Sequence, residues 1–194
     1  MGDYQVISGV SSGLANLLQD HLSAQLANAV QVDLRSPPEI GTPANQFTVS
    51  LWLYRVARDE FMFNVPPDRV VADQLPRPPM PVDLHYLVTP LHRDAGTAQV
   101  LLGGVMQALN DHAILRAADL GTPSPLGTDE LRLTFETLTL DELHQIWYAL
   151  SEPYHLSVSY VAQVVSIESG HEPVRTAPIV ERRARYEQIV GVEP

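Results

Sequence analysis

Apolar residues recur every three or four positions in three stretches of the chain, which is the pattern of a helix with one buried face. The first stretch covers about residues 8–28 and the second about residues 98–111. The third begins after Thr139, where Glu142 stands three residues further on and completes the sequence pattern of a capping box. These patterns predict three helices that each lie with one side on a core.

Five other stretches are rich in β-branched and aromatic residues, and several alternate between apolar and polar positions. They predict strands at residues 30–34, 46–58, 82–89, 131–136 and 156–167. Residues 46–58 have apolar side chains on both alternating sets, so we expect a central strand that is covered on both faces. Pro37 and Pro38 are expected to end the first strand and to begin a loop that runs to Asn45, and Pro90 is expected to stop the third strand.

The order of the predicted elements indicates the fold class. One helix is followed by three strands, and then helices and strands alternate, so the sequence predicts one α/β (α+β) domain with a mixed β-sheet flanked by helices. We expect this domain to cover residues 1–170, followed by a C-terminal arm at residues 171–194. Gly103 and Gly104 cost roughly 1 kcal/mol each relative to alanine inside a helix, so we expect a close packing contact there.

The composition excludes several classes of function. The 194 residues include no cysteine and no lysine, which excludes disulfides, thiolate metal sites and cysteine nucleophiles. Twelve arginines against 23 acidic residues give a net charge of −11, which argues against nucleic-acid binding. The longest apolar stretches run for about ten residues, too short to span a membrane, and no signal peptide is visible. We therefore expect cytoplasmic assembly and no membrane insertion.

The charge is distributed unevenly along the chain. Residues 174–194 carry four arginines against three glutamates, whereas the rest carries eight arginines against twenty acidic residues. Residues 66–81 contain six of the sixteen prolines, which excludes a helix and predicts a stiff extended loop. We expect both segments to reach neighbouring subunits, the alternative for the tail being the solvated end of an ordinary domain. The candidate assembly contacts are Arg69, Arg77, Arg175, Arg182, Arg183 and Arg185.

Residues that could carry chemistry are few. No glycine-rich phosphate loop and no Gly-x-Ser-x-Gly nucleophile motif is present. Asp83, His85 and His92 form the best metal-like cluster, although a strand histidine that is hydrogen-bonded by its neighbours explains the pattern better. A second candidate, an acid–base carboxylate pair, is drawn from Glu136, Asp141 and Glu142. The helix dipole explains the latter two as first-turn acids, so we expect no catalytic residue, no metal and no cofactor.

Four segments together resemble one protein family. They are LWLYRV at residues 51–56, VDLHYLVT at 82–89, LLGGVMQALNDHAIL at 101–115 and ELRLTFETLTLDELHQIWYALSEPYHLSVSYVAQVVSI at 130–167. In this order they resemble the cap, or tail-terminator, family of extracellular contractile injection systems of the antifeeding-prophage and virulence-cassette type. The resemblance spans about residues 4–168, and residues 59–65, with Met62 and Phe63, depart from the polar loop of the family.

The resemblance implies a structural role without catalytic residues. Such a cap is expected to have a phage tail-terminator-like fold and to form a homohexameric ring on the last inner-tube ring, beside the last sheath ring, at the end distal to the baseplate. A tube made by head-to-tail stacking stops growing when a subunit covers its end without offering a new face. The alternatives are another ring-forming tail or baseplate adaptor of the same particle, and an enzyme or small-molecule binding domain at Asp83, His85 and His92. Such a particle is either released from the cell or retained inside it.

Overall fold

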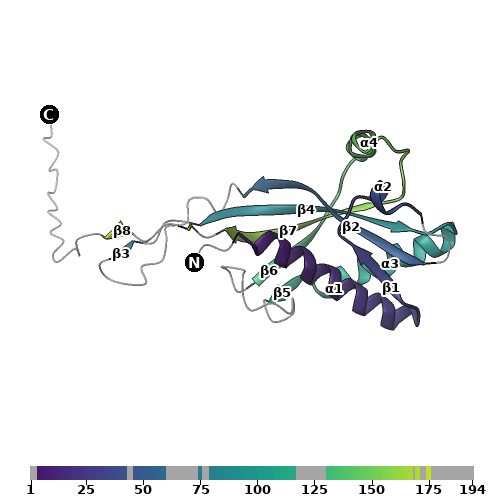
Figure 1. Ribbon diagram of the computed structural model, residues 1–194, viewed down its shortest axis with the longest axis horizontal. Helices are drawn as coiled ribbons and strands as arrows, with labels where there is room; N and C mark the ends of the chain where they lie inside the picture. The colour runs from purple at the N-terminus through teal and green to yellow at the C-terminus, as the bar shows by residue number, and fades with distance from the viewer. Residues whose placement is uncertain are drawn as a thin grey trace, which may run out of the picture.

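The computed structural model describes residues 4–42, 46–59, 74–75, 79–116, 130–167, 169–170 and 174–175. A six-stranded sheet forms the middle layer of the body (Figure 1). Helices α1 and α3 lie side by side on one face of this sheet, and α4 crosses the opposite face. None of the described helices has the length and hydropathy needed to cross a membrane.

The sheet is mixed, as the order of the elements predicts. Its strands follow one another in the order β1 (Val30–Asp33), β2 (Phe47–Arg58), β4 (Met80–Leu91), β7 (Val158–Ile167), β6 (Glu130–Glu136) and β5 (Ile114–Arg116). The pair β1–β2 is parallel, whereas the other neighbours are antiparallel. The α/β class with a mixed sheet flanked by helices is therefore confirmed.

The predicted helices are present with small shifts in their ends. They are α1 (Val6–Leu26), α3 (Ala95–Asp111) and α4 (Leu140–Ala149). The expected loop after β1 is wrong in part, because α2 (Pro37–Ile40) forms a short helix there. Ser36 caps it and Glu39 closes a capping box, while a proline is well suited to the first helical position.

Pro90 does not stop β4, which continues to Leu91. The residue pairs with Val49 of β2, while the register of β4 with β7 ends at Val88. One side of β4 is therefore open at Pro90, and the missing N–H of proline removes no ladder bond on that side. The prediction that this proline ends the strand is wrong for this reason.

The core lies between the helices α1 and α3 and the sheet. Leu18 and Leu22 of α1 and Leu101 and Val105 of α3 are fully buried against it. A Cβ at Gly104 would lie 2.7 Å from Cδ2 of Leu22, so this glycine permits the close approach of the two helices. A Cβ at Gly103 would meet nothing within 4 Å, so the expected close contact is confirmed at Gly104 and wrong at Gly103.

Strand β2 is enclosed on both sides only at its start. It pairs with β1 over four residues, Phe47 to Ser50, and with β4 along nearly its whole length. Beyond Ser50 no strand pairs with its outer side within the described residues, and its side chains change from buried to half-buried and exposed. The expected central strand is therefore central at its beginning and an edge strand over residues 52–57.

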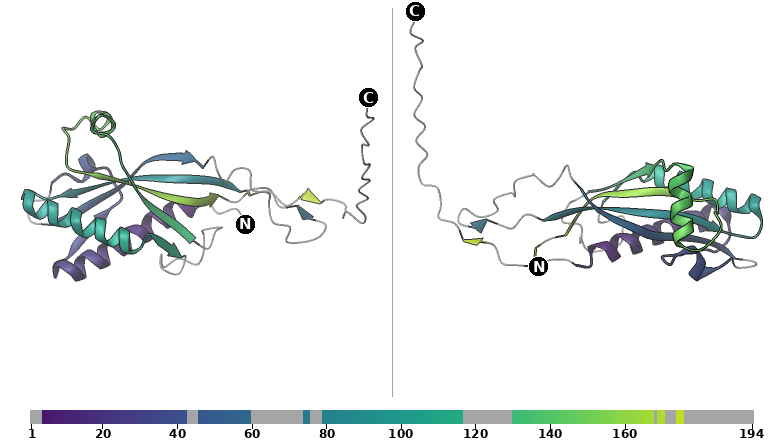
Figure 2. Two further views of the ribbon diagram at one scale, coloured as in Figure 1. Left: turned by 180° about the vertical axis from the view of Figure 1, so that it is seen from behind. Right: turned by 90° about the horizontal axis from the view of Figure 1, so that it is seen from above.

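Two short strands pair away from this sheet. Strand β3 (Gln74–Leu75) and strand β8 (Val174–Arg175) form an antiparallel ladder in which Gln74 lies opposite Arg175. Both views in Figure 2 place this ladder beyond the ends of β4 and β7, away from α3 and α4. The proline-rich loop and the C-terminal arm, which the sequence predicts as separate segments, therefore share one pairing. The boundary between residues 170 and 171 stays a prediction.

Candidate assembly surfaces

The metal-like cluster is not brought together. The ring of His92 stacks on that of Phe47 with 5.5 Å between the centroids, and its Nδ1 accepts a hydrogen bond from the backbone N–H of Asp94. His85 instead points toward Glu136 on β6. Among the described residues no three His, Asp or Glu side chains are arranged to hold a metal ion. The structure therefore favours the interpretation of His85 as a strand histidine held by its neighbours.

Glu136 is the centre of a polar network that joins four strands. Ser159 of β7 and Tyr54 of β2 donate hydrogen bonds to its Oε2 over 2.7 and 3.0 Å, and Nδ1 of His85 on β4 lies 3.1 Å from both carboxylate oxygens. Burial alone would raise the pKa of Glu136, but the hydrogen bonds from Ser159, His85 and Tyr54 outweigh it and hold this pKa below its usual value. Burial also raises the pKa of the Tyr54 hydroxyl. The arrangement holds a carboxylate firmly ionised between the strands.

The proposed carboxylate pair is better explained by the start of α4. The Glu142 carboxylate accepts hydrogen bonds from the backbone N–H and the hydroxyl of Thr139, and the hydroxyl of Thr139 accepts from the backbone N–H of Glu142. This is the capping box that the sequence predicts, and these bonds lower the pKa of Glu142. Asp141 lies exposed in the same first turn. Glu142 is thus occupied by capping rather than by acid–base chemistry with Glu136.

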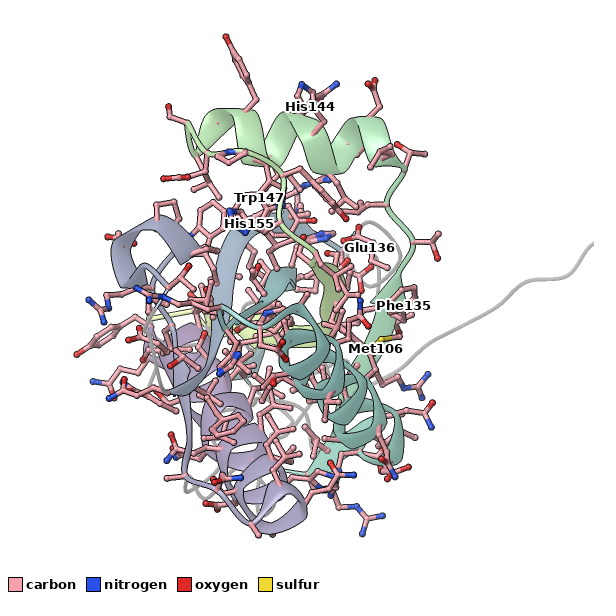
Figure 3. The ribbon with its side chains drawn as sticks, turned by 90° about the vertical axis from the view of Figure 1, so that its right-hand side faces the viewer. Met106, Phe135, Glu136, His144, Trp147 and His155 are labelled. Atoms are coloured by element: carbon pink, nitrogen blue, oxygen red, sulfur yellow. The ribbon has the colours of Figure 1, made fainter. Side chains whose placement is uncertain are left out.

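Helix α4 touches the rest of the body through few side chains. Trp147 is its only buried residue, and its indole N–H donates to the hydroxyl of Ser157 over 3.2 Å. The rings of Trp147 and His155 lie 5.1 Å apart, and Figure 3 shows both beneath the helix. His144 points away from the body on the opposite side of the helix in the same view. The helix is therefore held from one side and open on the other.

A groove of about 440 Å³ separates α4 from strand β2. Its walls are formed by Trp52, Tyr54, Arg55, Leu138, Glu142, Gln145, Ile146 and Ala149. The register of β2 against β4 shifts between Leu53 and Arg55, so Tyr54 is an extra residue in the ladder. Such a bulge re-aims side chains, and here Tyr54 and its neighbour Arg55 both line the groove. The hydrogen bond of Tyr54 to Glu136 fixes the position of Tyr54 in the groove wall.

The outer side of α4 carries exposed apolar groups among acidic ones. Leu140 at the start of α4 and Tyr148 near its end are 71% and 78% exposed. Residues 137–157 contain Asp141, Glu142 and Glu152 but no arginine. Large exposed apolar side chains rimmed by charges are typical of a surface that contacts another protein.

Two further exposed apolar side chains lie toward the β6 side of the sheet and are called here the patch of Met106 and Phe135. Met106 of α3 and Phe135 of β6 are 37% and 45% exposed, and both are labelled on this side of the body in Figure 3. The Phe135 ring packs edge-on against Tyr160 with 5.4 Å between the centroids, which fixes its orientation. This patch is separated from the groove by the width of the sheet, since β2 and β6 lie on either side of β4 and β7.

The arginines that the sequence singles out fall mostly outside the described residues. Arg175 belongs to β8 and pairs with Gln74. Arg69, Arg77, Arg182, Arg183 and Arg185 lie outside the described ranges, as does most of the proline-rich loop. Their role in assembly stays a prediction. The groove beside Tyr54 and the Glu136 network carry no local sequence signal, because both depend on which strands become neighbours.

His85, His92 and Glu142 are hydrogen-bonded to different neighbours, and Oδ1 of Asp83 is buried without a hydrogen-bond partner. The described surface of this α/β domain offers a groove, an open strand edge and exposed apolar helix residues, which are features of a structural assembly domain. The sequence model of the Pvc16 N-terminal domain family matches residues 9–181. The chain therefore belongs to the Pvc16 N-terminal domain family, and the resemblance seen in its sequence is confirmed. No curated protein matches the chain.

Two solved structures share the fold. The first is the sheath/tube terminator, in the extended state, of the extracellular contractile injection system PVC, with a TM-score of 0.66 and 17% identity over 96% of this chain and 65% of the other. The second is the tube-terminating cap of the anti-feeding prophage, with a TM-score of 0.57 and 19% identity over 88% of this chain and 59% of the other. The chain thus spans less than two thirds of the length of either protein.

Proposed function

We propose that the protein is a structural cap, or tail terminator, of a phage-tail-like contractile injection particle. It closes the distal end of the inner tube, contacts the last sheath ring, stops polymerisation and stabilises the extended particle. The match of the Pvc16 N-terminal domain family to residues 9–181 carries this proposal. The two terminator structures that share the fold over most of the chain support it.

The cap acts as a ring that has one face for the tube. We propose that this ring is a homohexamer. In a ring built by head-to-tail contacts, two different surfaces of each subunit meet. The described body offers such surfaces on either side of its sheet, namely the groove with the open edge of β2 and the patch of Met106 and Phe135. A ring that matches the tube on one face only stops its growth.

Contacts with neighbouring proteins of the particle, which include the sheath and further copies of the cap, are assigned to the segments joined by the β3–β8 ladder. The ladder lies away from the body, and the two segments contain Arg69, Arg77, Arg175, Arg182, Arg183 and Arg185. A guanidinium group holds carboxylates through two parallel hydrogen bonds, which suits contacts with acidic neighbours. The particle assembles in the cytoplasm and is either released or retained.

We infer no catalytic activity for this cap. The support is geometric, because His85 and His92 are occupied by different neighbours and Glu142 caps α4. Metal analysis of the purified protein tests this directly, and a stoichiometric metal ion would favour the enzyme alternative. A position in a baseplate adaptor ring is the other alternative, and labelling the protein on intact particles would place it at one end or the other.

The central experiment is deletion of the gene in a strain that makes the particles. We expect particles of variable length, or contracted particles, in negative-stain micrographs, because nothing ends the tube and holds the sheath. Expression of the wild-type protein from a plasmid is the control and restores a uniform length. Uniform, extended particles in the deletion strain would contradict the cap function.

A further inference from the structure

Strand β2 has an open edge next to the groove that separates it from α4. Residues 52–57 of β2 have β4 on one side and no strand on the other within the described part of the chain. An open edge beside a groove is the arrangement that receives an extended segment, which pairs with the edge through its backbone and places alternate side chains in the groove. The groove walls present aromatic rings at Trp52 and Tyr54 and the apolar side chain of Ile146.

The charges around the groove indicate which charges a bound segment should carry. Glu142 in the wall of the groove and its neighbour Asp141 lie exposed at the start of α4, and the exposed Arg55 lines the groove from β2. A segment with arginines facing the helix and a carboxylate facing Arg55 matches these charges. Residues 176–194 of this chain contain Arg182, Arg183 and Arg185 between Glu181 and Glu187, together with β-branched residues that suit a strand.

We propose that the groove between α4 and β2 binds the C-terminal segment, residues 176–194, of a neighbouring copy of this chain. The segment adds to the open edge of β2, its arginines meet Asp141 and Glu142, and its glutamates meet Arg55. The proposal deepens the proposed function, on which it rests, by naming the link between subunits of the cap.

The position of β8 and the length of the segment allow it to reach a neighbouring copy. The ladder from which residues 176–194 continue lies at the end of the molecule away from α4 (Figures 1 and 2). Fully extended, these residues reach about 60 Å. That length exceeds the roughly 40 Å diameter of a domain of this size, so the segment can reach an adjacent subunit.

Disulfide trapping tests this link, because the natural chain contains no cysteine that would compete. One tagged copy carries Gln145→Cys in the groove wall, and a second copy with a different tag carries Ala184→Cys in the segment. Both are expressed together in the deletion strain, and particles are purified under mild oxidation. The matched control replaces Gln145→Cys with Ser12→Cys, an exposed position on α1 at the opposite face of the sheet.

We expect a disulfide between the two tagged copies on a non-reducing gel, at about tenfold the level of the control, because docking raises the effective concentration of the two thiols. Equal trapping at Ser12→Cys, or no trapping in particles of normal length, would overturn the proposal. A single chain with both cysteines that closes only on itself would overturn it as well. Particle length in the deletion strain reports separately on the cap function, so the two failures are distinguishable.

A charge exchange gives an independent readout. Asp141→Arg alone and Arg183→Glu alone should each lower the amount of cap retained on purified particles, and the two together in one chain should restore it. Asp141 lies outside the capping box, so the helix keeps its N-terminal hydrogen bonds. Equal loss in the double variant and in the single variants would contradict the contact between the arginine segment and α4.

Discussion

Nδ1 of His85 lies 3.1 Å from both carboxylate oxygens of Glu136, at the point where four adjacent strands pass beneath α4. Tyr54 and Ser159 donate to the same carboxylate, so one ionised group joins β2, β4, β7 and β6. A network of this kind stabilises only while every member keeps its partner. It also fixes Tyr54 in the wall of the groove, which links the stability of the sheet to the shape of the assembly surface.

Replacement of Glu136 by glutamine should reveal this network through its pH dependence. The pKa of Glu136 in the folded protein lies below its usual value of 4.5, so its stabilising effect is present above that value and is lost as the pH falls through the folded pKa. We expect Glu136→Gln to lower the free energy of unfolding by about 1–2 kcal/mol at neutral pH and by less below pH 4.5. Urea unfolding at several pH values measures both, and a difference that does not change with pH would contradict the ionised network.

The two adjacent glycines of α3 provide a matched pair of variants. A methyl group at Gly104 would lie 2.7 Å from the buried end of Leu22, so Gly104→Ala should destabilise the protein by about 1–3 kcal/mol. Gly103 faces open space, and Gly103→Ala should stabilise the helix by about 0.5–1 kcal/mol. Urea unfolding of both variants is the measurement. The same sign for both changes would show that the packing of α1 against α3 is not as described.

Trp147 should determine whether α4 stays on the sheet. Its indole N–H donates to Ser157 and its ring contacts that of His155, and α4 has no other buried residue. We expect Trp147→Ala to increase amide hydrogen exchange across residues 140–149 while α1 and α3 keep their protection, because the loss is local. The exposed His144→Ala is the control and should leave exchange unchanged. Equal exchange in both variants would contradict the anchoring role.

Local sequence patterns predict a helix well where apolar spacing or a capping box defines it. The spacing of Leu14, Leu18 and Leu22 predicts α1, and Thr139 with Glu142 predicts the start of α4. The sequence does not predict α2, because two prolines indicate a strand end and a loop, although Ser36 and Glu39 are spaced as a capping box.

The site depends on relationships that no local pattern contains. Tyr54 on β2 bonds to Glu136 on β6 across the two strands β4 and β7 that lie between them. This contact depends on the strand order, which follows from the packing of the whole chain. The bulge at Tyr54 shifts the alternation of side chains along β2 by one residue. A strict period of two would therefore place Arg55 on the face of the sheet away from the groove, whereas it lines the groove together with Tyr54. The pairing of Gln74 with Arg175 likewise joins segments about a hundred residues apart.

Truncation after Pro173 should detach the cap from the particle. The change removes β8, the partner of β3, together with the arginines at positions 175, 182, 183 and 185. A strand pair of two residues each is marginal on its own, so β3 should lose its pairing while the six-stranded sheet remains. Immunogold labelling of particles should fall severalfold, with unfolding of the purified body unchanged. A triple variant, Arg182→Gln with Arg183→Gln and Arg185→Gln, keeps β8. Comparing it with the truncated protein separates the effect of the lost charges from that of the lost strand pairing. Undiminished labelling of the truncated protein would rule out an anchoring role for the arm.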